Sequence, residues 1–546
     1  MPPINAYPSD KRSPVIQALR KPRPSGWFLL SILLLSFGLR TWGIRFGLPE
    51  YTRYHPDEHA LVERAAAILW TGDWNLHRFN YPPFYAYLQA IAYAAYFLWG
   101  ASKGLWQAIM PFPLPQYYHV GRLLTACLGT LTILVVYLIG RELYGRRIGL
   151  LAAALLGSCY LHVIHSHYVT FDIALAFWVS LTLLFSALMI SRPRSGWWFW
   201  AGLSAGLAGA TKYNGATVFI VPLLAHVLAI PWGEWGWIDS RLVRMIAGFL
   251  AGLVGGNPFA LAFLPDFLNG LATVLHHYGT QQPGFEGTGN WRWYPGVFLS
   301  SADAVWTCMG TVGLIGLSLR QWRKGLLLAV FPLAYYLMVA RFVVRFERNM
   351  VPLLPFLALG GGWLLDTSVR WVSSRLKRTG LAPILAVAGL LLFAAPSLVA
   401  AVSFDFLLTQ TDHRQIAGNW VENHIAPGSR IAIEHYSIPF DYDRYDVTDV
   451  IRITDHNLVW YQQGGFDYLI ISDGVWEVLR RQPQVYADRL AIYDELTSGS
   501  RLVAEFVRDP PGLVVAGYPT VAVYHFAPVR IYQVLRGGTD AQVATP

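Results

Sequence analysis

Two carboxylates and two imidazoles lie close together in the stretch HPDEH, just after the first apolar segment of the chain. Asp57 and Glu58 stand between His55 and His59. A carboxylate at a membrane surface can deprotonate a hydroxyl nucleophile, which is the work of a general base. The stretch also suits a helix start, because Pro56 fits the first helical position and acids in the first turn complement the helix dipole. The two interpretations are compatible.

A third acid, Asp172, follows YVTF and opens another apolar run. It could simply begin a helix, or it could also face the acceptor or a divalent cation. His165 and His167 precede it. Imidazole and carboxylate ligands would suit a transition metal if these residues and the HPDEH stretch met. Packing at the membrane interface is the alternative for both histidines, and the metal is left unknown.

Four cations stand out in the second half of the chain. Lys212 separates two apolar runs, where it either extends to the interface or pairs with an anion. Arg341, Arg345 and Arg348 are spaced three to four residues apart, which predicts one face if the segment is helical. They are either a solvated helix end balanced by a nearby acid or a clamp for phosphate.

The composition indicates the surroundings of these groups. The chain has 546 residues, of which 54% are hydrophobic and 14% are charged, against about 25% charged in soluble proteins. Apolar runs of about 18 residues or more recur, which is typical of a polytopic α-helical membrane protein. The three cysteines lie in apolar runs and indicate core packing rather than a disulfide framework or a metal site.

Eleven membrane spans are predicted, and six basic segments support that number. These segments surround Lys11–Arg23, Arg141–Arg147, Arg192–Arg194, Arg241–Arg244, Arg320–Lys324 and Arg370–Arg378, and eleven spans put all of them on one side. The positive-inside rule makes that side cytoplasmic, which explains the net charge of +9 without nucleic acid. The expected spans are 26–46, 119–140, 148–165, 171–190, 197–211, 213–231, 245–264, 297–319, 325–340, 349–365 and 381–403.

The aromatic-rich segment 82–100 is excluded from the spans, because counting it would reverse every later loop. It is expected to be an interfacial or re-entrant helix after a first external loop at 47–81. Both lie in a membrane domain expected at 1–404. With eleven spans and the basic loops in the cytoplasm, every second loop lies outside. The HPDEH stretch, Asp172, Lys212 and the three arginines are therefore expected on the outer face of the cell membrane. The arginines break the positive-inside trend there, which an outward-facing phosphate would explain.

The tail, residues 405–546, has mixed charge and short β-rich runs, which predict a small extracytoplasmic α/β domain. Strands are expected at 429–436, 467–472, 501–507 and 521–526, and a helix at 414–424. The loop 276–296 is rich in Gly, Gln and aromatic residues. It is either a plain connection or a lid over a sugar substrate.

The stretch HPDEHALVERAAAILWTGDWNLHRFNYPPFYAYL resembles the first external loop of the GT-C glycosyltransferases that use polyprenyl-phosphate sugars. Protein O-mannosyltransferases and lipid A aminoarabinose transferases share its order of acid pair, helix, G-D-W and proline-rich turn. The stretches SHYVTFDIALAFW, GATKYNG and RFERNMVPLLPFLAL resemble later parts of the same families. The aminoarabinose transferases carry a further acid before the loop's final proline, where this chain has Asn80 and Tyr81. That difference argues against their donor and against a metal.

The resemblance implies a GT-C fold and an inverting transfer of a sugar from polyprenyl phosphate to a hydroxyl acceptor, which could be a protein, lipid or glycan. Asp57 is then expected to be the general base, and Glu58 a supporting acid or a group that orients the acceptor. Asp172, His55 and His59 would contact the acceptor or a cation. Lys212, Arg345, Arg348 and Arg341 would bind the donor phosphate among the membrane lipids. Arg345 and Arg348 are the preferred members among the arginines.

Two other functions remain open at this stage. A transporter or flippase of lipid-linked sugars would also need outward cations, but it usually has ionisable residues at mid-membrane and internal repeats. A scaffold or sensor would use the tail to bind an external ligand. For the enzyme, partial desolvation is expected to raise the pKa of Asp57 and so make it a better base.

Overall fold

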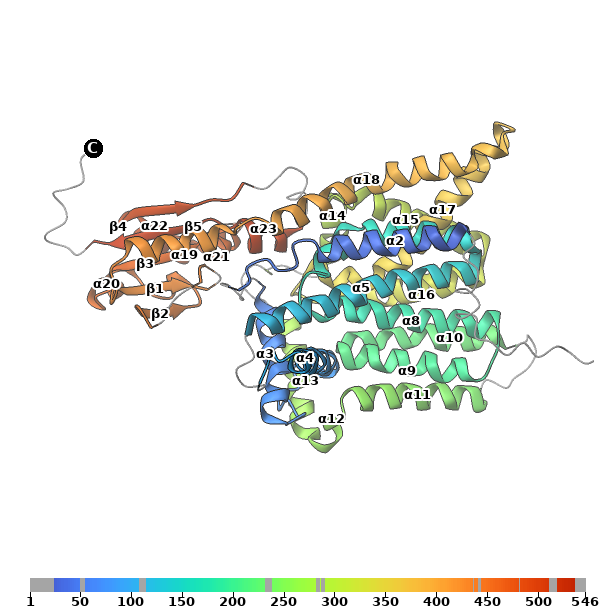
Figure 1. The fold of residues 1–546 in the computed structure, drawn as a ribbon, viewed down its shortest axis with the longest axis horizontal. Coiled ribbons are helices and arrows are strands. Elements are labelled where there is room, and N and C mark those ends of the chain that lie inside the picture. Colours follow the sequence, from blue (N-terminus) through green and yellow to red (C-terminus); the bar gives the residue numbers. More distant parts are fainter. Residues whose placement is uncertain are drawn as a thin grey trace, which may run out of the picture.

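The computed structural model describes residues 24–49, 55–107, 114–230, 238–280, 285, 290–435, 437–439, 443–480, 482–509 and 518–535. The predicted basic segment at Lys11–Arg23 lies outside them. Most of the chain before residue 409 forms a bundle of helices, and the tail forms a separate layer of sheet and helices at one end of it (Figure 1).

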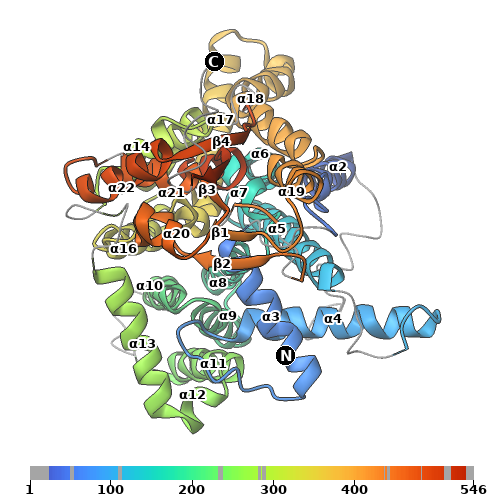
Figure 2. The same ribbon diagram turned by 90° about the vertical axis from the view of Figure 1, so that its left-hand side faces the viewer.

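The bundle helices run side by side along one axis, as Figures 1 and 2 show. Their apolar sequences explain both the helices and their burial, because an α-helix satisfies its own backbone groups away from water. The principal members are α2 (Pro24–Thr41), α5 (Leu114–Tyr144), α6 (Arg146–Ser158), α7 (Tyr160–His165), α8 (Phe171–Ser191), α9 (Gly196–Thr211), α10 (Ile220–Ala229), α11 (Ser240–Gly256), α15 (Ala304–Arg320), α16 (Trp322–Val339), α17 (Leu354–Arg375) and α18 (Ala382–Leu408).

Five described helices are long and apolar enough to cross a membrane, or six if the bent pair α14 (Trp293–Leu299) and α15 counts as one span. The protein is therefore a multi-pass helical membrane protein, and eleven spans stay a prediction. Several expected spans are short or broken. Segment 148–165 breaks at Cys159 between α6 and α7, and segment 349–365 begins within a 3-10 helix, η2 (Glu347–Leu353).

Loops on the predicted cytoplasmic side contact one another at the end of the bundle away from the sheet. Arg192 pairs with Glu142 at 2.8 Å, and Lys324 donates to the carbonyl oxygen of Leu143 at 2.7 Å. Arg147 pairs with Asp366 at 2.7 Å. The structure thus brings these loops together as the parity argument requires, while the side of the membrane that they occupy stays a prediction.

The opposite end carries α3 (Pro56–Thr71), α4 (Phe84–Ser102), α12 (Phe259–Ala262) and α13 (Leu264–Gly279). Figure 1 shows α4 end-on and Figure 2 shows it from the side, so it lies across the bundle axis. This orientation is the one expected of an interfacial helix. The HPDEH stretch begins α3 as predicted, and the imidazole of His55 caps it by accepting from the backbone N–H of Asp57 at 3.2 Å.

The tail folds into a five-stranded mixed sheet with the order β2-β1-β3-β5-β4. The first three strands in this order are parallel, and β5 pairs antiparallel with both β3 and β4. The elements are α19 (His413–His424), β1 (Arg430–Glu434), β2 (Asp446–Val450), α20 (Leu458–Gln463), β3 (Tyr468–Ser472), α21 (Asp473–Arg480), α22 (Ala487–Ser498), β4 (Ser500–Phe506), α23 (Pro519–Phe526) and β5 (Val529–Val534).

The expected strand at 521–526 is wrong, because these residues belong to helix α23. The alternation in VAVYHF suggested a strand, but Pro519 lies at the start of a helix. Tyr518, Val521 and His525 are buried, and their spacing is that of a helix face. Strands β2 and β5 were not predicted.

Helices α9 and α11 touch through glycines spaced four residues apart. A Cβ added at Gly206 would lie 2.2 Å from the carbonyl oxygen of Phe249, and one added at Gly252 would lie 2.3 Å from that of Leu203. Such contacts are impossible for any side chain, so the backbones meet directly, as in the small-residue crossings of membrane helices.

We expect Gly252→Ala to lower the free energy of unfolding by about 1–3 kcal/mol, because the added methyl group forces α9 and α11 apart. Thermal unfolding of the purified protein in detergent measures the effect. Gly255→Ala is the matched control on the same helix, since a Cβ there meets nothing within 4 Å. Equal melting temperatures for the two variants would contradict the direct backbone contact.

Candidate functional site

An ion pair joins the predicted base to a predicted phosphate ligand. Arg348 Nη1 lies 2.5 Å from Asp57 Oδ2, with 9% and 26% of the two side chains exposed. Asp57 comes from the first turn of α3 and Arg348 from η2, so the pair connects segments almost three hundred residues apart in sequence. The guanidinium also lies over the ring of Phe346, 4.4 Å from its centroid.

A second ion pair lies beside the first. Lys212 Nζ donates to Asp172 Oδ1 at 2.9 Å and to Asn349 Oδ1 at 3.2 Å. Asn349 in turn donates to the hydroxyl of Tyr294 at 3.2 Å. Lys212 stands where α9 ends and η1 (Tyr213–Phe219) begins, so a break in the helical run directs the ammonium group into the bundle. Asp172 Oδ2 is buried and has no hydrogen-bond partner among the described residues.

The two ion pairs form one electrostatic cluster, because Arg348 interacts with Asp172 as well as Asp57. Burial raises the pKa of Asp57, but Arg348, His55 and Lys212 together outweigh burial and hold that pKa below its usual value. The expected rise of this pKa is therefore wrong for the protein without substrate. The sequence suggested that Asp57 would be partly buried, but it could not show that the Arg348 guanidinium would lie 2.5 Å from the carboxylate.

The three arginines do not share a helical face, and that expectation is wrong. Residues 341–346 are not helical, and η2 begins only at Glu347. Arg348 is buried in the cluster, Arg345 is half-buried and Arg341 is exposed. Arg345 donates to Asn290 Oδ1 at 3.1 Å and lies over the ring of Trp293. Arg348 is the arginine that pairs directly with Asp57.

Glu58 has a different environment from its neighbour. It is fully buried and accepts two hydrogen bonds of 2.8 Å from Arg122 of α5. Its Oε1 also accepts from the backbone N–H of Val169 at 3.0 Å. Arg122 donates further to the carbonyl oxygens of Ile44 and Phe46. Glu58 thus fastens α3 to α5 and to the loop before α8, which favours the supporting role over contact with an acceptor.

The predicted histidines do not gather into a cation site. His59 faces Tyr118 and Glu63, at 3.1 and 3.2 Å, and His167 interacts with backbone carbonyls and with Asp405. Burial lowers the pKa of His55 to about 3, so this capping imidazole is neutral. Within the described residues, no three His, Cys, Asp or Glu side chains converge as metal ligands.

The two ends of the predicted lid are fixed beside the arginines. The backbone N–H of Val343 donates to the carbonyl oxygen of Tyr278 at 2.9 Å, and that of Asn290 donates to Ala340 at 2.7 Å. Residues 281–284 and 286–289 of the loop lie outside the described residues. The lid itself therefore stays a prediction.

Sequence reasoning missed the residues that position the predicted ones. Arg122 could have been identified from the sequence, because it is a charged residue inside an apolar run, and such residues are usually paired and functional. Asn349, Tyr294 and Asn290 carried none, because neutral polar residues are common near span ends.

Residues 118–259 match the family model described as dolichyl-phosphate-mannose-protein mannosyltransferase. The resemblance expected from the sequence is confirmed. The match covers about a quarter of the chain, and over these residues the chain is similar to glycosyltransferases named for a dolichyl-phosphate sugar donor. No curated relative matches the chain.

Solved structures show the same fold. ArnT from Cupriavidus metallidurans in the apo state has a TM-score of 0.54 at 16% identity, over 93% of this chain and 98% of that one. The same protein bound to undecaprenyl phosphate has a TM-score of 0.53 at 17% identity, with the same coverage. The Archaeoglobus fulgidus oligosaccharyltransferase in the apo form has 0.53 at 13% identity, over 88% and 73%. The protein therefore has the ArnT-like GT-C fold, with the mixed sheet at its C-terminal end.

We expect Glu58→Ala to reduce the free energy of unfolding by about 3–5 kcal/mol, because it leaves the guanidinium of Arg122 buried without its partner. Thermal unfolding in detergent measures this loss. Glu63→Ala is the matched control on the same helix, since about half of the Glu63 side chain is exposed. A Glu58→Ala protein as stable as the control would show that the Arg122 pair does not hold α3.

Proposed function

We propose that the enzyme transfers a sugar, with inversion, from polyprenyl phosphate to a hydroxyl acceptor at the outer face of the cell membrane. The observation that carries this proposal is the direct pairing of a carboxylate, Asp57, with a buried guanidinium, Arg348. One group can take a proton and the other can bind a phosphate, and both act within the reach of a single substrate.

The reaction breaks one bond at the anomeric carbon and forms another. The acceptor oxygen attacks that carbon while Asp57 takes the hydroxyl proton, and the polyprenyl phosphate leaves with the bonding electron pair. Arg348 and Lys212 would stabilise the charge that develops on this leaving group. Arg345 is half-buried and lies three residues before Arg348, so it would assist in binding the phosphate. Arg341 is exposed, and we assign it the weakest contribution to phosphate binding.

The same guanidinium cannot fully serve both anions. When the donor phosphate binds Arg348, the guanidinium contributes less to holding the proton off Asp57. Burial then raises the pKa of this carboxylate, and it becomes a stronger base. Donor binding would in this way activate the base that receives the acceptor's proton.

Asp172 has two roles in this proposal. Its Oδ1 holds the ammonium group of Lys212 near the phosphate position. Its other oxygen, which lacks a hydrogen-bond partner among the described residues, would accept a hydrogen bond from the acceptor. His55 shapes the start of α3, and His59 is directed towards Tyr118 and Glu63 instead.

The comparisons support the donor class. One of the similar structures is ArnT bound to undecaprenyl phosphate, and another is the archaeal oligosaccharyltransferase AglB with a dolichol-phosphate and an inhibitory peptide. The positive-inside rule supports a cytoplasmic N-terminus, with the active site and sheet domain outside. A transporter of lipid-linked sugars would use similar cations but has no need of the carboxylate, so the carboxylate favours the enzyme.

We expect Asp57→Asn to reduce sugar transfer by about a hundredfold or more, as removal of a general base typically does. The assay incubates the purified protein with a panel of labelled undecaprenyl-phosphate sugars and hydroxyl acceptors and follows the release of undecaprenyl phosphate. Full turnover by this variant would refute the assignment of the base. A wild-type protein that binds these lipids without cleaving them would favour the transporter.

Arg348→Ala and Lys212→Ala should each weaken the binding of undecaprenyl phosphate about tenfold or more, since each removes a charge-assisted contact. Binding to the purified protein is followed by microscale thermophoresis. Arg341→Ala is the matched control and should stay within about twofold of the wild type. If Arg341→Ala alone weakened the binding of undecaprenyl phosphate, the phosphate would not lie at Arg348 and Lys212.

The pH dependence tests the activation of the base. In the free enzyme the pKa of Asp57 is low, so kcat/KM for the donor should not fall until strongly acidic pH. In the donor complex the pKa is higher, so kcat should fall as the pH decreases through a value at least about one unit higher. Initial rates between about pH 3 and 8, at limiting and at saturating donor, show whether kcat falls at a higher pH than kcat/KM does. Coincident limbs would mean that donor binding leaves the Asp57–Arg348 pair unchanged.

A further inference from the structure

The connection between β4 and β5 leaves the sheet domain and enters the membrane bundle. These strands are antiparallel neighbours, yet residues 507–528 separate them. Hairpin connections are usually about two to five residues long, and much longer ones are commonly functional. Helix α23 lies within this connection, between the sheet and the bundle in Figure 1.

The apolar side chains of α23 pack in the bundle core. Tyr518, Val521 and Phe526 belong to the same buried cluster as the membrane helices, separate from the two clusters that stabilise the sheet. The helix is therefore held by the membrane domain although the chain reaches it from the sheet.

Buried hydrogen bonds fix both ends of α23 to the bundle. The Tyr518 hydroxyl donates to Asp303 Oδ2 at 2.7 Å. Asp303 also accepts from the backbone N–H groups at the start of α7, at 2.9 and 3.0 Å. At the other end, His525 Nε2 lies 2.5 Å from the hydroxyl of Tyr168.

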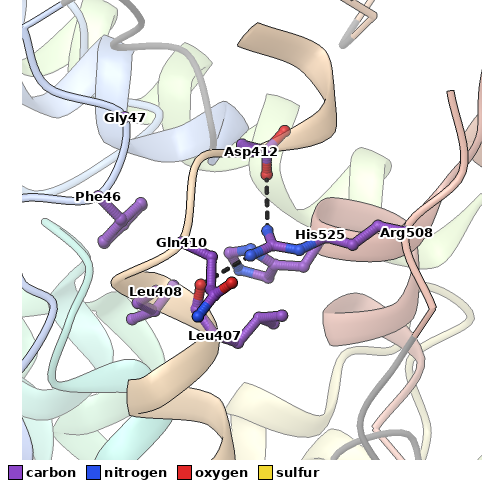
Figure 3. A pocket seen from close by; sticks show the side chains of 8 residues that line it. All are labelled: Phe46, Gly47, Leu407, Leu408, Gln410, Asp412, Arg508 and His525. Carbon is purple, nitrogen blue, oxygen red and sulfur yellow. Dashed lines mark hydrogen bonds and ion pairs between the residues drawn. The ribbon is translucent and has the colours of Figure 1, made fainter. Parts of the chain in front are cut away.

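The start of the connection is anchored in the same region. Figure 3 shows Arg508, just after β4, and His525, from α23, lining one small pocket with residues from the end of α18. Arg508 donates to the carbonyl oxygen of Leu407 at 2.7 Å and to Asp412 at 3.3 Å. Polar contacts thus hold the connection against the end of the bundle.

From this position α23 reaches the reacting groups. The ring of Tyr524 packs edge-on against the imidazole of His55, with centroids 4.9 Å apart, and Tyr168 contacts the same imidazole at 4.8 Å. His55 caps the helix that carries Asp57. Tyr524 also interacts electrostatically with Arg348, and its side chain is only partly buried. An aromatic ring with a hydroxyl group therefore stands at the edge of the Asp57–Arg348 pair.

We infer that α23 forms the acceptor-side wall of the active site and that Tyr524 is a positioning residue for the hydroxyl-bearing acceptor. The inference rests on the proposed function, because it is the acceptor that must approach Asp57. The Tyr524 ring offers an apolar face to the acceptor, and its hydroxyl offers a hydrogen bond. The sheet domain thus completes the catalytic site instead of serving as an appended module.

The kinetic test compares variants of two neighbouring residues in the full-length protein. Tyr524→Ala should raise KM for the acceptor at least tenfold with a smaller change in kcat. Tyr524→Phe removes the hydroxyl group and keeps the ring, so it measures the contribution of the hydroxyl alone. Val523→Ala is the matched control, because Val523 faces Gly474 in the sheet domain, and it should keep the wild-type KM. Equal effects at both positions, or a loss confined to kcat, would overturn the inference.

A second test requires neither sugar nor acceptor. In a chain whose three native cysteines are replaced by serine, an anionic methanethiosulfonate reagent labels Tyr524→Cys or Val523→Cys. Bound undecaprenyl phosphate, near Arg348, should slow labelling at 524 at least fivefold and leave 523 unchanged. Equal rates at 524 with and without bound lipid would overturn the inference alone. A wild-type protein that binds no undecaprenyl phosphate would contradict the proposed function, and the inference with it.

Discussion

Four charges held inside an apolar bundle set the main constraint on this structure. Asp172 is buried and Asp57 is half-buried, and each has a buried cation, Lys212 or Arg348, within 3 Å. Removing one partner from such a pair typically costs about 3–5 kcal/mol, because the remaining charge has lost its water. The segments that carry the charges must therefore meet in one arrangement, although they come from distant parts of the sequence.

Much of the surrounding structure serves to fix these segments. The Glu58–Arg122 pair holds α3 against α5, and the same carboxylate holds the loop that leads into Asp172. Breaks in the helices then direct the cations inward, since Lys212 lies between α9 and η1, and Arg348 lies in η2. Short and broken helices are also the reason why fewer helices qualify as membrane spans by length than the sequence predicts.

The sequence predicts composition-driven features well and contacts poorly. Apolar runs correctly indicate a helical membrane protein, and Pro56 with its following acids correctly indicates a helix start. Motif order correctly points to the mannosyltransferase family whose model matches residues 118–259. The pKa of Asp57 could not be predicted, because its sign depends on a guanidinium distant in sequence. The sequence also could not distinguish a strand from a helix at residues 521–526. A half-buried strand and a helix packed against a bundle both place apolar residues at short intervals.

The central claim is that donor phosphate and Asp57 share Arg348. It is tested most directly by a structure of the full-length protein with undecaprenyl phosphate bound, compared with the free protein. The account predicts a phosphate oxygen within about 3 Å of the Arg348 guanidinium, with Asp57 separated from that guanidinium by more than the free protein's 2.5 Å. A phosphate bound away from Arg348 and Lys212, with the Asp57 pair intact, would contradict it.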